Sequence, residues 1–385
     1  MWARFKIALT PTLSRERERG PSRNWRVTPI RMLRCSGYTL AMSLLFRDAA
    51  GPSLAPGGSV ACVGAFDGVH LGHRALLDRV SVRARAENLL ACAISFEPIP
   101  REFFARGASV PRLASAREKI ERICAADMDR LLSLRFDARL AAMEAEDFVE
   151  HVLVARCGVR EIWTGADFRF GHNRRGDVAM LERLGRQHGF LAKTLTDIEV
   201  GGERVSSSAI RAHLSAGEFD AAARLLGRAF SIGGHVVHGQ ALGRKLGYPT
   251  ANIPLGRRVS PVGGIFAVRV HGVETDAMPG VASLGMRPMV NGTEPLLEAH
   301  LFDFDGDLYG SRIEVEFVAK LRDEQKFADL EAMVRQIDRD AAEAREILAS
   351  ASISAIAYPF RHPRESSDPA PLRSIKGTGF PLPRE

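Results

Sequence analysis

An alternation of short apolar runs with helix-like stretches, sustained from residue 59 to residue 226, constrains the fold of this chain more than any other feature. Strands that alternate with helices of about 10–15 residues form a parallel sheet covered on both faces. Such sheets bind ligands beyond the carboxyl ends of their strands. The pattern predicts strands at Val60–Gly64, Leu89–Phe96, Arg130–Arg135, Glu161–Thr164 and within Phe190–Val200.

The pattern changes near Arg228. From Phe230 to Val318 the chain holds short β-like runs separated by Gly and Pro, which is typical of an antiparallel barrel. A single long helical pattern follows at Ala328–Leu348. We therefore expect an α/β domain over residues 48–228 and a β-barrel domain with a C-terminal helix over residues 229–350.

The charge of the chain is concentrated at its start. The net charge is +7, yet residues 1–47 alone hold ten basic and two acidic side chains, so the remainder is close to neutral. A near-neutral globular part carries no general nucleic-acid footprint. We interpret residues 1–47 as a disordered basic extension or an over-long gene start, with Met42 as the alternative start. Residues 351–385, rich in Pro, Ser and Arg, are predicted to be a disordered tail.

Two classes of protein are excluded or disfavoured by composition. No apolar run approaches the roughly 18–20 residues that a membrane-spanning helix needs, which excludes an integral membrane protein. The cysteine count is odd, and no CxxC or Cys/His spacing suits zinc. We expect buried thiols in a reduced, cytoplasmic protein. The cysteines are Cys35, Cys62, Cys92, Cys124 and Cys157.

The segment Gly64–His73 follows the first predicted strand and opens a helix. Gly64 and Gly68 let the backbone approach a ligand, and the helix N-terminus is an anion site. His70 and His73 are three residues apart, so they share one face of the first turn and can donate to phosphate oxygens as charge builds on a leaving pyrophosphate. The alternative is a pair of surface histidines without a role.

Two later segments should converge on the same edge of the sheet. Gly165–Gly171 follows a predicted strand, and Val205–Arg211 begins a helix. The three serines at 206–208 can cap that helix and donate hydroxyl groups to phosphate, while Arg211 can act as a charge clamp. Helix capping alone is the alternative for the serines.

A third motif lies in the barrel region. It runs from Gly234 to Asn252 and is dense in glycine, whose backbone N–H groups can cradle phosphates. The Thr250 hydroxyl and the Asn252 carbonyl are hard oxygen ligands suited to Mg²⁺. Glu298 alternates with apolar neighbours on a predicted strand, where a carboxylate can accept a proton from an attacking hydroxyl. An outward strand glutamate without a role is the alternative.

These motifs resemble a known family. FDGVHLGH, SFEPIPREFF, TGADFRFGHNRRGD and VSSSAIR resemble the adenylyltransferase module of prokaryotic bifunctional riboflavin kinases/FAD synthetases, and GRKLGYPTAN, GIFAV, GMRP, LEAHLFDFDGDLYG and LRDEQKF resemble the riboflavin kinase module. The resemblance covers about residues 55–348. It implies an α/β nucleotidyltransferase domain with a Rossmann-like parallel sheet, followed by an antiparallel β-barrel riboflavin kinase domain with a C-terminal helix.

The resemblance also implies the chemistry. ATP with Mg²⁺ would phosphorylate riboflavin to FMN, with Glu298 as general base and with Thr250 and Asn252 holding the metal. The FMN phosphate would then attack the α-phosphorus of ATP, releasing pyrophosphate and FAD, with His70, His73 and Arg211 stabilising charge. The remaining candidate binding residues are Gly64, Phe66, Asp67, Gly68, Gly72, Asp167, Ser206, Ser207 and Ser208 in the first domain, and Gly239, Gly243, Arg244, Gly247 and Arg322 in the second.

Three positions depart from the family pattern. Ile99 stands where many relatives carry His, Met289 replaces a usual Thr, and Ser208 replaces Thr. One alternative is therefore a chain that retains a single activity. Another is a flavin-sensing RNA-binding regulator, which the complete motif sets and the terminal position of the basic segment disfavour. We expect small-molecule substrates only, no nucleic-acid or membrane partner, and a monomer or weak homo-oligomer.

Overall fold

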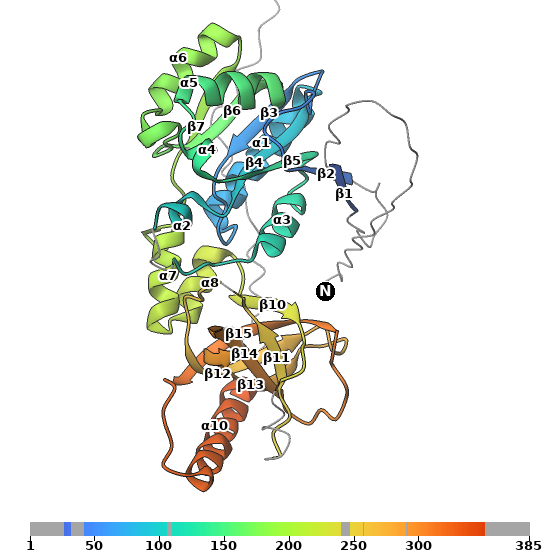
Figure 1. Cartoon of the computed structure of the whole chain (residues 1–385), viewed down its shortest axis with the longest axis vertical. Helices are drawn as coiled ribbons and strands as arrows, with labels where there is room; N and C mark the ends of the chain where they lie inside the picture. Colours follow the sequence, from blue (N-terminus) through green and yellow to red (C-terminus); the bar gives the residue numbers. More distant parts are fainter. Residues whose placement is uncertain are drawn as a thin grey trace, which may run out of the picture.

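The computed structural model describes residues 27–31, 42–105, 110–239, 247–256, 258–289 and 292–350. An α/β domain lies at one end of the molecule and a β-barrel at the other, with a long helix against the barrel (Figure 1). Both parts of the predicted fold class are confirmed. Within the described residues, none of the helices combines the length and apolarity that a bilayer-spanning segment requires.

The first domain is built on a seven-stranded sheet in the order β1-β2-β5-β4-β3-β6-β7. All neighbours are parallel except β1 and β2. The strand order reverses at β3, which lies between β4 and β6, and this is where open parallel sheets bind ligands. The strands are β1 (Val27–Arg31), β2 (Met42–Phe46), β3 (Ser59–Val63), β4 (Leu90–Glu97), β5 (Arg130–Arg135), β6 (Val159–Gly165) and β7 (Leu191–Leu195).

Helices cover both faces of this sheet, so β3 is buried along its whole length. Local capping sets several boundaries: Ser115 and Glu118 form a reciprocal capping box, and Asp177 caps the helix that begins at Val178. The helices are α1 (Leu71–Ala86), α2 (Pro100–Phe104), α3 (Ala116–Cys124), α4 (Ala138–Ala141), α5 (Ala145–Asp147) with a π-helical continuation η1 (Phe148–Arg156), η2 (His172–Arg174), α6 (Val178–His188), α7 (Ser207–Ala216) and α8 (Phe219–Leu226), with a small hairpin of β8 (Glu199–Val200) and β9 (Glu203–Arg204) before α7.

The prediction that residues 1–47 lie outside the fold is wrong for β1 and for the strand with which it pairs, β2. This strand pairs in parallel with β5, and the side chains of Leu45 and Phe46 are buried. Hydrophobic burial of a strand-length apolar run therefore outweighs the basic character of the surrounding segment. Residues 1–26, 32–41 and 351–385 lie outside the described residues, so the extension and the tail stay predictions.

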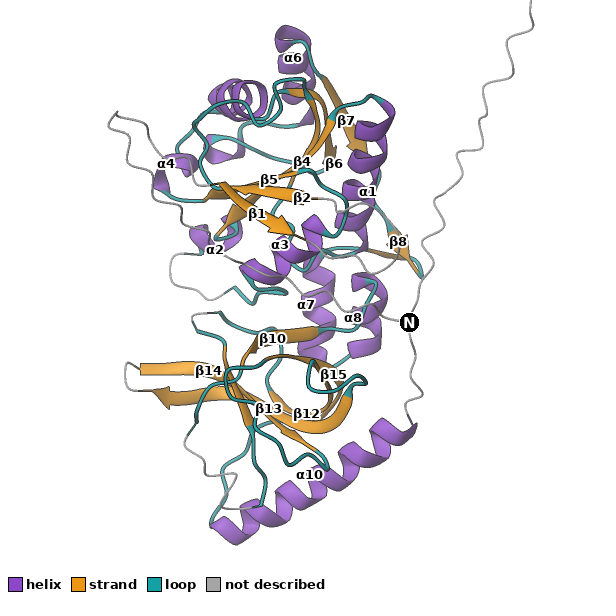
Figure 2. Ribbon diagram, turned by 90° about the vertical axis from the view of Figure 1, so that its right-hand side faces the viewer, coloured by secondary structure: helices purple, strands orange, loops and turns teal. Residues whose placement is uncertain are grey.

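The second domain is a six-stranded antiparallel sheet in the order β10-β15-β12-β13-β14-β11. A bridge between Val237 and Asn252 brings its two ends together, so the sheet is a nearly closed barrel. The helix α10 (Leu330–Ser350) packs outside, with Ala344 against Ala267 and Val281 (Figure 2). The strands are β10 (Ser231–His235), β11 (Ala251–Pro254), β12 (Gly264–His271), β13 (Met278–Met289), β14 (Gly292–Leu301) and β15 (Arg312–Arg322).

The helices α7 and α8 lie between the sheet and the barrel (Figure 2). Ile210 and Leu214 of α7 belong to the same buried cluster as the interior of the barrel. The ring of Phe219 on α8 lies 5.8 Å from that of Phe266 and 6.0 Å from that of Phe317. The helices that precede the predicted boundary at 228/229 therefore share a hydrophobic core with the barrel.

Candidate functional sites

The loop between β3 and α1 carries three residues in the left-handed backbone region. They are Phe66, with φ of 50°, Gly68, with φ of 80°, and Val69, with φ of 44°. This conformation strains a β-branched residue such as Val69, at a cost of roughly 1–3 kcal/mol. Surrounding contacts must hold such a loop in place, and strained segments of this kind concentrate at functional sites.

His70 and His73 form a stacked pair at the start of α1. Their ring centroids lie 3.7 Å apart, and Nδ1 of His70 accepts a hydrogen bond from the His73 backbone N–H at 3.3 Å. Burial, together with Arg228 and Arg211, lowers the pKa of His70 to about 3, and burial is also the main cause of the lowered pKa of His73. Burial thus disfavours the charged form of both rings, and the hydrogen bond accepted by Nδ1 is compatible with a proton on Nε2 of His70.

The carboxylate of Asp67 is buried beneath this loop. It accepts a hydrogen bond from the Leu113 N–H at 3.1 Å and forms an ion pair with Arg211. Arg211 also donates to the carbonyls of Pro111, at 2.7 Å, and Ser207, at 3.0 Å. Burial raises the pKa of Asp67, and Arg211 opposes that shift. The two predicted site residues thus contact each other and join α7 to the loop.

The serine segment reaches the same loop. Ser206 is the N-cap of α7 and accepts a hydrogen bond from the Ala209 N–H at 3.1 Å. The Ser207 hydroxyl donates to the Asp67 carbonyl at 3.1 Å, while Ser208 is exposed on the first turn. Capping is therefore the role of one serine, and a second serine joins α7 to the loop at the start of α1.

Phe66 differs from its predicted binding role, because its ring is fully buried. It packs edge-on against the His73 ring, with 5.1 Å between centroids, so it supports the histidine pair. Two glycines make room in this cluster. A Cβ on Gly64 would lie 3.3 Å from the Phe66 ring, and one on Gly72 would lie 3.3 Å from the His70 ring.

Asp167 follows β6, on the other side of the strand-order reversal. Its side chain is exposed and forms an ion pair with Arg204 at 3.0 Å. Arg204 also contacts Asp197 at 2.8 Å. The carboxyl ends of β3 and β6 and the start of α7 thus meet in one region, as the parallel sheet requires.

Sequence reasoning missed a buried charged group at the carboxyl end of β4. Lys119 of α3 donates to the Phe96 carbonyl at 2.6 Å and pairs with Glu97 at 2.9 Å, and burial lowers its pKa. Arg112 pairs with the same Glu97 at 2.5 Å. One signal was present: Lys119 lies four residues before the buried Ile123, on the face of α3 that helical spacing assigns to the core.

An aromatic cluster lies at the carboxyl ends of β4 and β5. The Phe136 ring is 5.7 Å from Phe96, 5.4 Å from Phe103 and 5.7 Å from Phe104. Phe104 is 58 % exposed, which gives the cluster an open aromatic surface. Ile99, which departs from the family pattern, is buried at the N-cap of α2.

In the barrel, strand register brings two predicted residues together. Asn252 of β11 lies opposite Glu298 of β14, whose other neighbour is Ser283 of β13. Directly opposed side chains share a face of the sheet within contact distance. The Asn252 amide nitrogen donates to the Thr250 carbonyl at 3.2 Å, and a Cβ on Gly239 would lie 2.6 Å from that nitrogen.

The side chains of Thr250, Asn252 and Glu298 suit a hard divalent cation, provided that the substrate supplies some of its ligands. Thr250, Asn252 and Glu298 offer hydroxyl, amide and carboxylate oxygens, the ligand types that Mg²⁺ prefers. The described residues contain no group of three or more His, Cys, Asp or Glu able to hold a metal. Phosphate oxygens and water would therefore have to complete the coordination shell, as is usual for Mg²⁺.

Tyr248 and Pro249, which precede Thr250, form hydrogen bonds with α10 and β14. The Tyr248 hydroxyl donates to Asp338 of α10, and this contact is the main reason the pKa of Tyr248 is raised to about 12. His300 of β14 contacts the Pro249 carbonyl through Nδ1 at 2.9 Å. Gly247, with φ of 86°, makes the turn that precedes Tyr248. Gly243 and Arg244 lie outside the described residues, as does the side chain of Met289.

Arg322 is placed as an anchor for α10. Its Nε and Nη2 atoms donate to the buried Asp340 at 3.0 and 2.6 Å. Gln336 donates to the same carboxylate at 2.9 Å. Arg322 thus forms a salt bridge between β15 and the C-terminal helix, and its predicted ligand contact stays a prediction.

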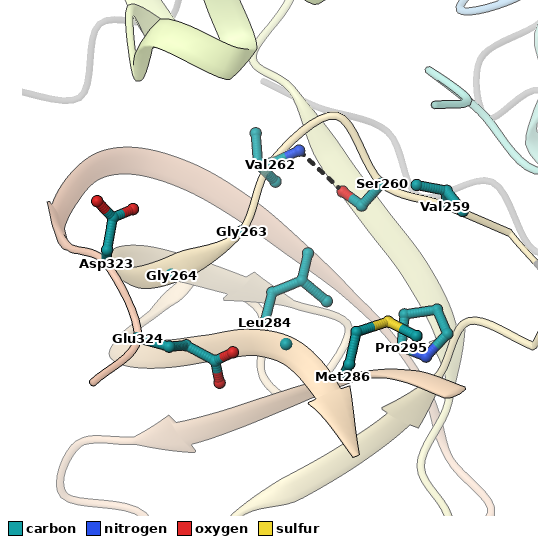
Figure 3. A pocket seen from close by; sticks show the side chains of 11 residues that line it. Val259, Ser260, Val262, Gly263, Gly264, Leu284, Met286, Pro295, Asp323 and Glu324 are labelled. Atoms are coloured by element: carbon teal, nitrogen blue, oxygen red, sulfur yellow. Dashed lines mark hydrogen bonds between the residues drawn. The ribbon is translucent and has the colours of Figure 1, made fainter. Parts of the chain in front are cut away.

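A cavity of about 390 Å³ lies at the mouth of the barrel (Figure 3). Its walls are mainly apolar, with the carboxylates of Asp323 and Glu324 at one side. Gly285, which lines it, is two residues along β13 from Ser283, the neighbour of Glu298; two residues of strand span about 7 Å. The other lining residues are Val259, Ser260, Val262, Gly263, Gly264, Leu284, Met286 and Pro295.

Comparisons with known proteins match both halves of the chain. A family model for FAD synthetase matches residues 53–209, and one for riboflavin kinase matches residues 226–348. The "Bifunctional riboflavin kinase/FMN adenylyltransferase" of Escherichia coli (strain K12) is 45% identical over 290 residues, which are 75% of this chain and 92% of that protein. The protein of the same name from Pseudomonas fluorescens is 45% identical over 293 residues, 76% of this chain and 94% of its own length.

A solved structure shares the fold. The crystal structure described as "Macrolide-efflux Protein from Streptococcus pneumoniae" superimposes with a TM-score of 0.65 at 26% identity. The likeness covers 80% of this chain and 99% of that one. Both domains and their order are therefore common to the two proteins.

Proposed function

This chain belongs to the family of bifunctional riboflavin kinases/FMN adenylyltransferases and catalyses both reactions, and we propose the following roles for its residues. The kinase reaction moves the γ-phosphoryl group of ATP to the 5′-hydroxyl of riboflavin. The adenylyltransferase reaction joins the FMN phosphate to the α-phosphorus of ATP and releases pyrophosphate. The observation that supports these roles is that the candidate residues form two separate clusters, one around His70 and His73 at the sheet edge and one around Asn252 and Glu298 in the barrel.

In the kinase site, Glu298 accepts the proton of the attacking 5′-hydroxyl. Thr250 and Asn252 orient the phosphates and, with them, a Mg²⁺ ion, which when bound neutralises phosphate charge. The register pairing of Asn252 with Glu298 supports this, because it brings the base beside the phosphate-orienting residues. Phosphoryl transfer needs chiefly alignment and charge neutralisation, so no protein nucleophile is required. The glycines at 239, 243 and 247 and Arg244 cradle the phosphates.

The 390 Å³ cavity takes the ring system of riboflavin. Its apolar walls suit a planar aromatic ring, and one of its carboxylates can accept a hydrogen bond from the single N–H of the ring system, at N3. Gly285 lies about 7 Å along β13 from the neighbour of Glu298, so the ribityl chain can extend from the cavity to the base.

In the adenylyltransferase site, the neutral rings of His70 and His73 donate hydrogen bonds to the phosphates at the N-terminus of α1. A bond forms between an FMN phosphate oxygen and the α-phosphorus as the bond from that phosphorus to pyrophosphate breaks. Donors fixed beforehand stabilise the charge that develops on the leaving group. Ser206–Ser208 line the same phosphates, Asp167 contacts adenine or ribose, and Arg211 acts through the loop that it holds.

The flavin ring of FMN stacks on the aromatic cluster around Phe136. The open face of Phe104 beside the sheet edge supports this placement. Stacking on an aromatic ring contributes about 0.5–1.5 kcal/mol beyond the area that it buries.

Incubation with riboflavin, ATP and Mg²⁺, followed by chromatography, tests the function directly. FMN should appear first and FAD second. His73→Ala should abolish FAD formation while FMN accumulates, and Glu298→Ala should block FMN formation yet leave FAD synthesis from supplied FMN. Loss of both activities in either variant would contradict separate sites, and a wild type that converts only riboflavin or only FMN would support the single-activity alternative.

The cellular setting and assembly are further parts of the proposal. The four described cysteines are free and buried, which supports a reducing, cytoplasmic setting. We expect a monomer or weak homo-oligomer, which light scattering across a range of protein concentrations would test.

A further inference from the structure

Arg228 lies where the α/β domain meets the barrel, and its guanidinium group reaches the strained loop before α1. Nη2 donates to the Gly68 carbonyl at 2.5 Å, and Nη1 donates to the Val69 carbonyl at 3.2 Å. Nη1 also donates to the Leu226 carbonyl at 3.3 Å, at the end of α8. One side chain therefore joins the loop to the chain segment that leads into β10, across 160 residues of sequence.

The junction backbone packs directly on the start of α1. Gly227 has φ of 72°, and a Cβ there would lie 2.4 Å from Cδ2 of Leu71, the first residue of α1. The Nε of Arg228 is shielded from solvent and has no hydrogen-bond partner within the described ranges. Burial also lowers the pKa of Arg228 to about 9.

Part of this placement is unfavourable for stability, although the C-terminus of α8, where Arg228 donates to the Leu226 carbonyl, favours a cation. A cation at the N-terminus of a helix opposes the helix dipole. A buried guanidinium with an unsatisfied donor costs additional free energy. Residues that a fold keeps at such a cost are often functional.

The two acceptor carbonyls explain what Arg228 does. In a trans peptide, the C=O and the N–H point in opposite directions. Because the Val69 carbonyl faces Arg228, the N–H of His70 points away from the junction. Arg228 thereby fixes the orientation of the peptide that enters His70, the residue that begins the phosphate-binding turn.

We propose that Arg228 is a positioning residue for adenylyl transfer, which holds the Gly68 and Val69 carbonyls so that the histidine pair meets the phosphates. This inference rests on the proposed adenylyltransferase site. It gives the junction between the domains a direct role in that reaction, although Arg228 itself belongs to neither phosphate site.

The test compares full-length Arg228→Met and Arg228→Lys with the matched control Arg224→Met, which changes an exposed arginine of α8. The kcat and KM for FAD formation from FMN and for FMN formation from riboflavin are measured on the same preparations. Arg228→Met should lower the adenylyltransferase kcat about hundredfold, the scale for misplaced reacting groups, with KM for FMN changed less than about threefold. The kinase kcat should stay within about twofold, as should both reactions of the control.

A lysine can donate to a carbonyl but cannot bridge two of them in a fixed fork. The adenylyltransferase kcat of Arg228→Lys should therefore be about tenfold higher than that of Arg228→Met. Should Arg228→Met fail to fold, Gly227→Ala provides a second perturbation, because it keeps the arginine but displaces the junction from Leu71. It should also lower the adenylyltransferase kcat selectively.

Two results would overturn the proposal. One is an unchanged adenylyltransferase kcat in every Arg228 and Gly227 variant that folds. The other is an equal loss of both activities that follows the folded fraction measured by circular dichroism, since this indicates a merely structural role. A wild type that forms no FAD would refute the proposed function itself, which separates the two failures.

Discussion

Glu118 connects the α/β domain to the barrel through a carboxylate that is only 4 % exposed. It accepts hydrogen bonds from the backbone N–H groups of Ser115, at 2.6 Å, and Gly233, at 2.9 Å, and it forms an ion pair with Arg258 at 3.3 Å. Gly233 and Arg258 belong to the barrel domain. Replacement of Glu118 by alanine removes the acceptor for two backbone donors and leaves Arg258 without this partner.

Removing one partner of a buried ion pair typically costs 3–5 kcal/mol, and the 3.3 Å separation favours the lower end, about 3 kcal/mol. For domains of this size each 1 kcal/mol lowers the melting temperature by about 2–4 °C, so Glu118→Ala should lower it by about 6–12 °C. Glu118→Gln keeps an oxygen for Gly233 and should lose about half as much. Differential scanning calorimetry of the full chain measures both.

Glu121→Ala is the matched control, because Glu121 lies on the same helix but pairs with Arg117 and Arg312 near the surface. The i,i+4 pair with Arg117 contributes about 0.3–0.5 kcal/mol and the pair with Arg312 about 0.2–1 kcal/mol, so the control should melt about 1–6 °C below wild type. If Glu118→Ala lowers the melting temperature no more than Glu121→Ala does, the buried carboxylate does not join the domains.

The same carboxylate gives a pH dependence with a defined sign. Burial alone would raise the pKa of Glu118, but Arg122, Arg258 and the backbone N–H groups of Ser115 and Gly233 together hold that pKa below its ordinary value. The stabilising contribution is therefore complete above about pH 4.3 and is lost as the pH falls through the folded-state value. The difference in melting temperature between wild type and Glu118→Gln should shrink over that acidic range. A difference that grows there would refute the sign.

Three smaller perturbations concern the kinase cradle, the aromatic cluster and one surface histidine. Gly239→Ala should lower the kinase kcat about hundredfold, because its Cβ would displace Asn252, while FAD formation from supplied FMN stays unchanged. Phe104→Ala should raise KM for FMN in the adenylyltransferase assay up to about tenfold and leave KM for riboflavin unchanged. Hydrogen bonds to Glu218 and a second glutamate raise the pKa of His213, so its stabilising effect is complete below about pH 6.5 and is lost as the pH rises through the raised value. The melting temperature difference between wild type and His213→Gln should shrink as the pH rises above about 6.5; a constant difference would contradict this.

The fold was predictable in segments where the spacing of apolar residues along the sequence indicates which side chains are buried. Strands such as β3 are apolar after their first residue, as expected where helices cover both faces of a sheet. The β-like runs separated by glycine indicate a barrel. The strands β1 and β2 were missed because residues 1–47 taken together are strongly basic, although residues 35–46 hold no basic side chain. The packing of α7 and α8 on the barrel was not predictable either. The sequence pattern of an amphipathic helix shows that it has an apolar face, but not which hydrophobic core that face packs against.

The site was predictable where its residues are neighbours in the chain. His70 and His73 share one turn of helix, and Thr250 and Asn252 share one short segment. Contacts between residues far apart in the sequence have no local sequence pattern that predicts them. The hydrogen bond from Arg228 to the Gly68 carbonyl, which spans 160 residues, is an example. Strand register likewise decides that Asn252 opposes Glu298, and a shift of one residue would place them on opposite faces.

The core shared by α7, α8 and the barrel limits how the enzyme can be divided. The first turn of α7 carries the serines of the adenylyltransferase, while Phe219 on α8 packs into the barrel interior. A cleavage after residue 228 leaves the upstream fragment with a bare apolar surface, and a cleavage before Ser206 removes its serines and Arg211. Neither fragment boundary yields two halves that keep the packing of the full chain, so we expect each separated fragment to be less stable than the same residues in the intact protein.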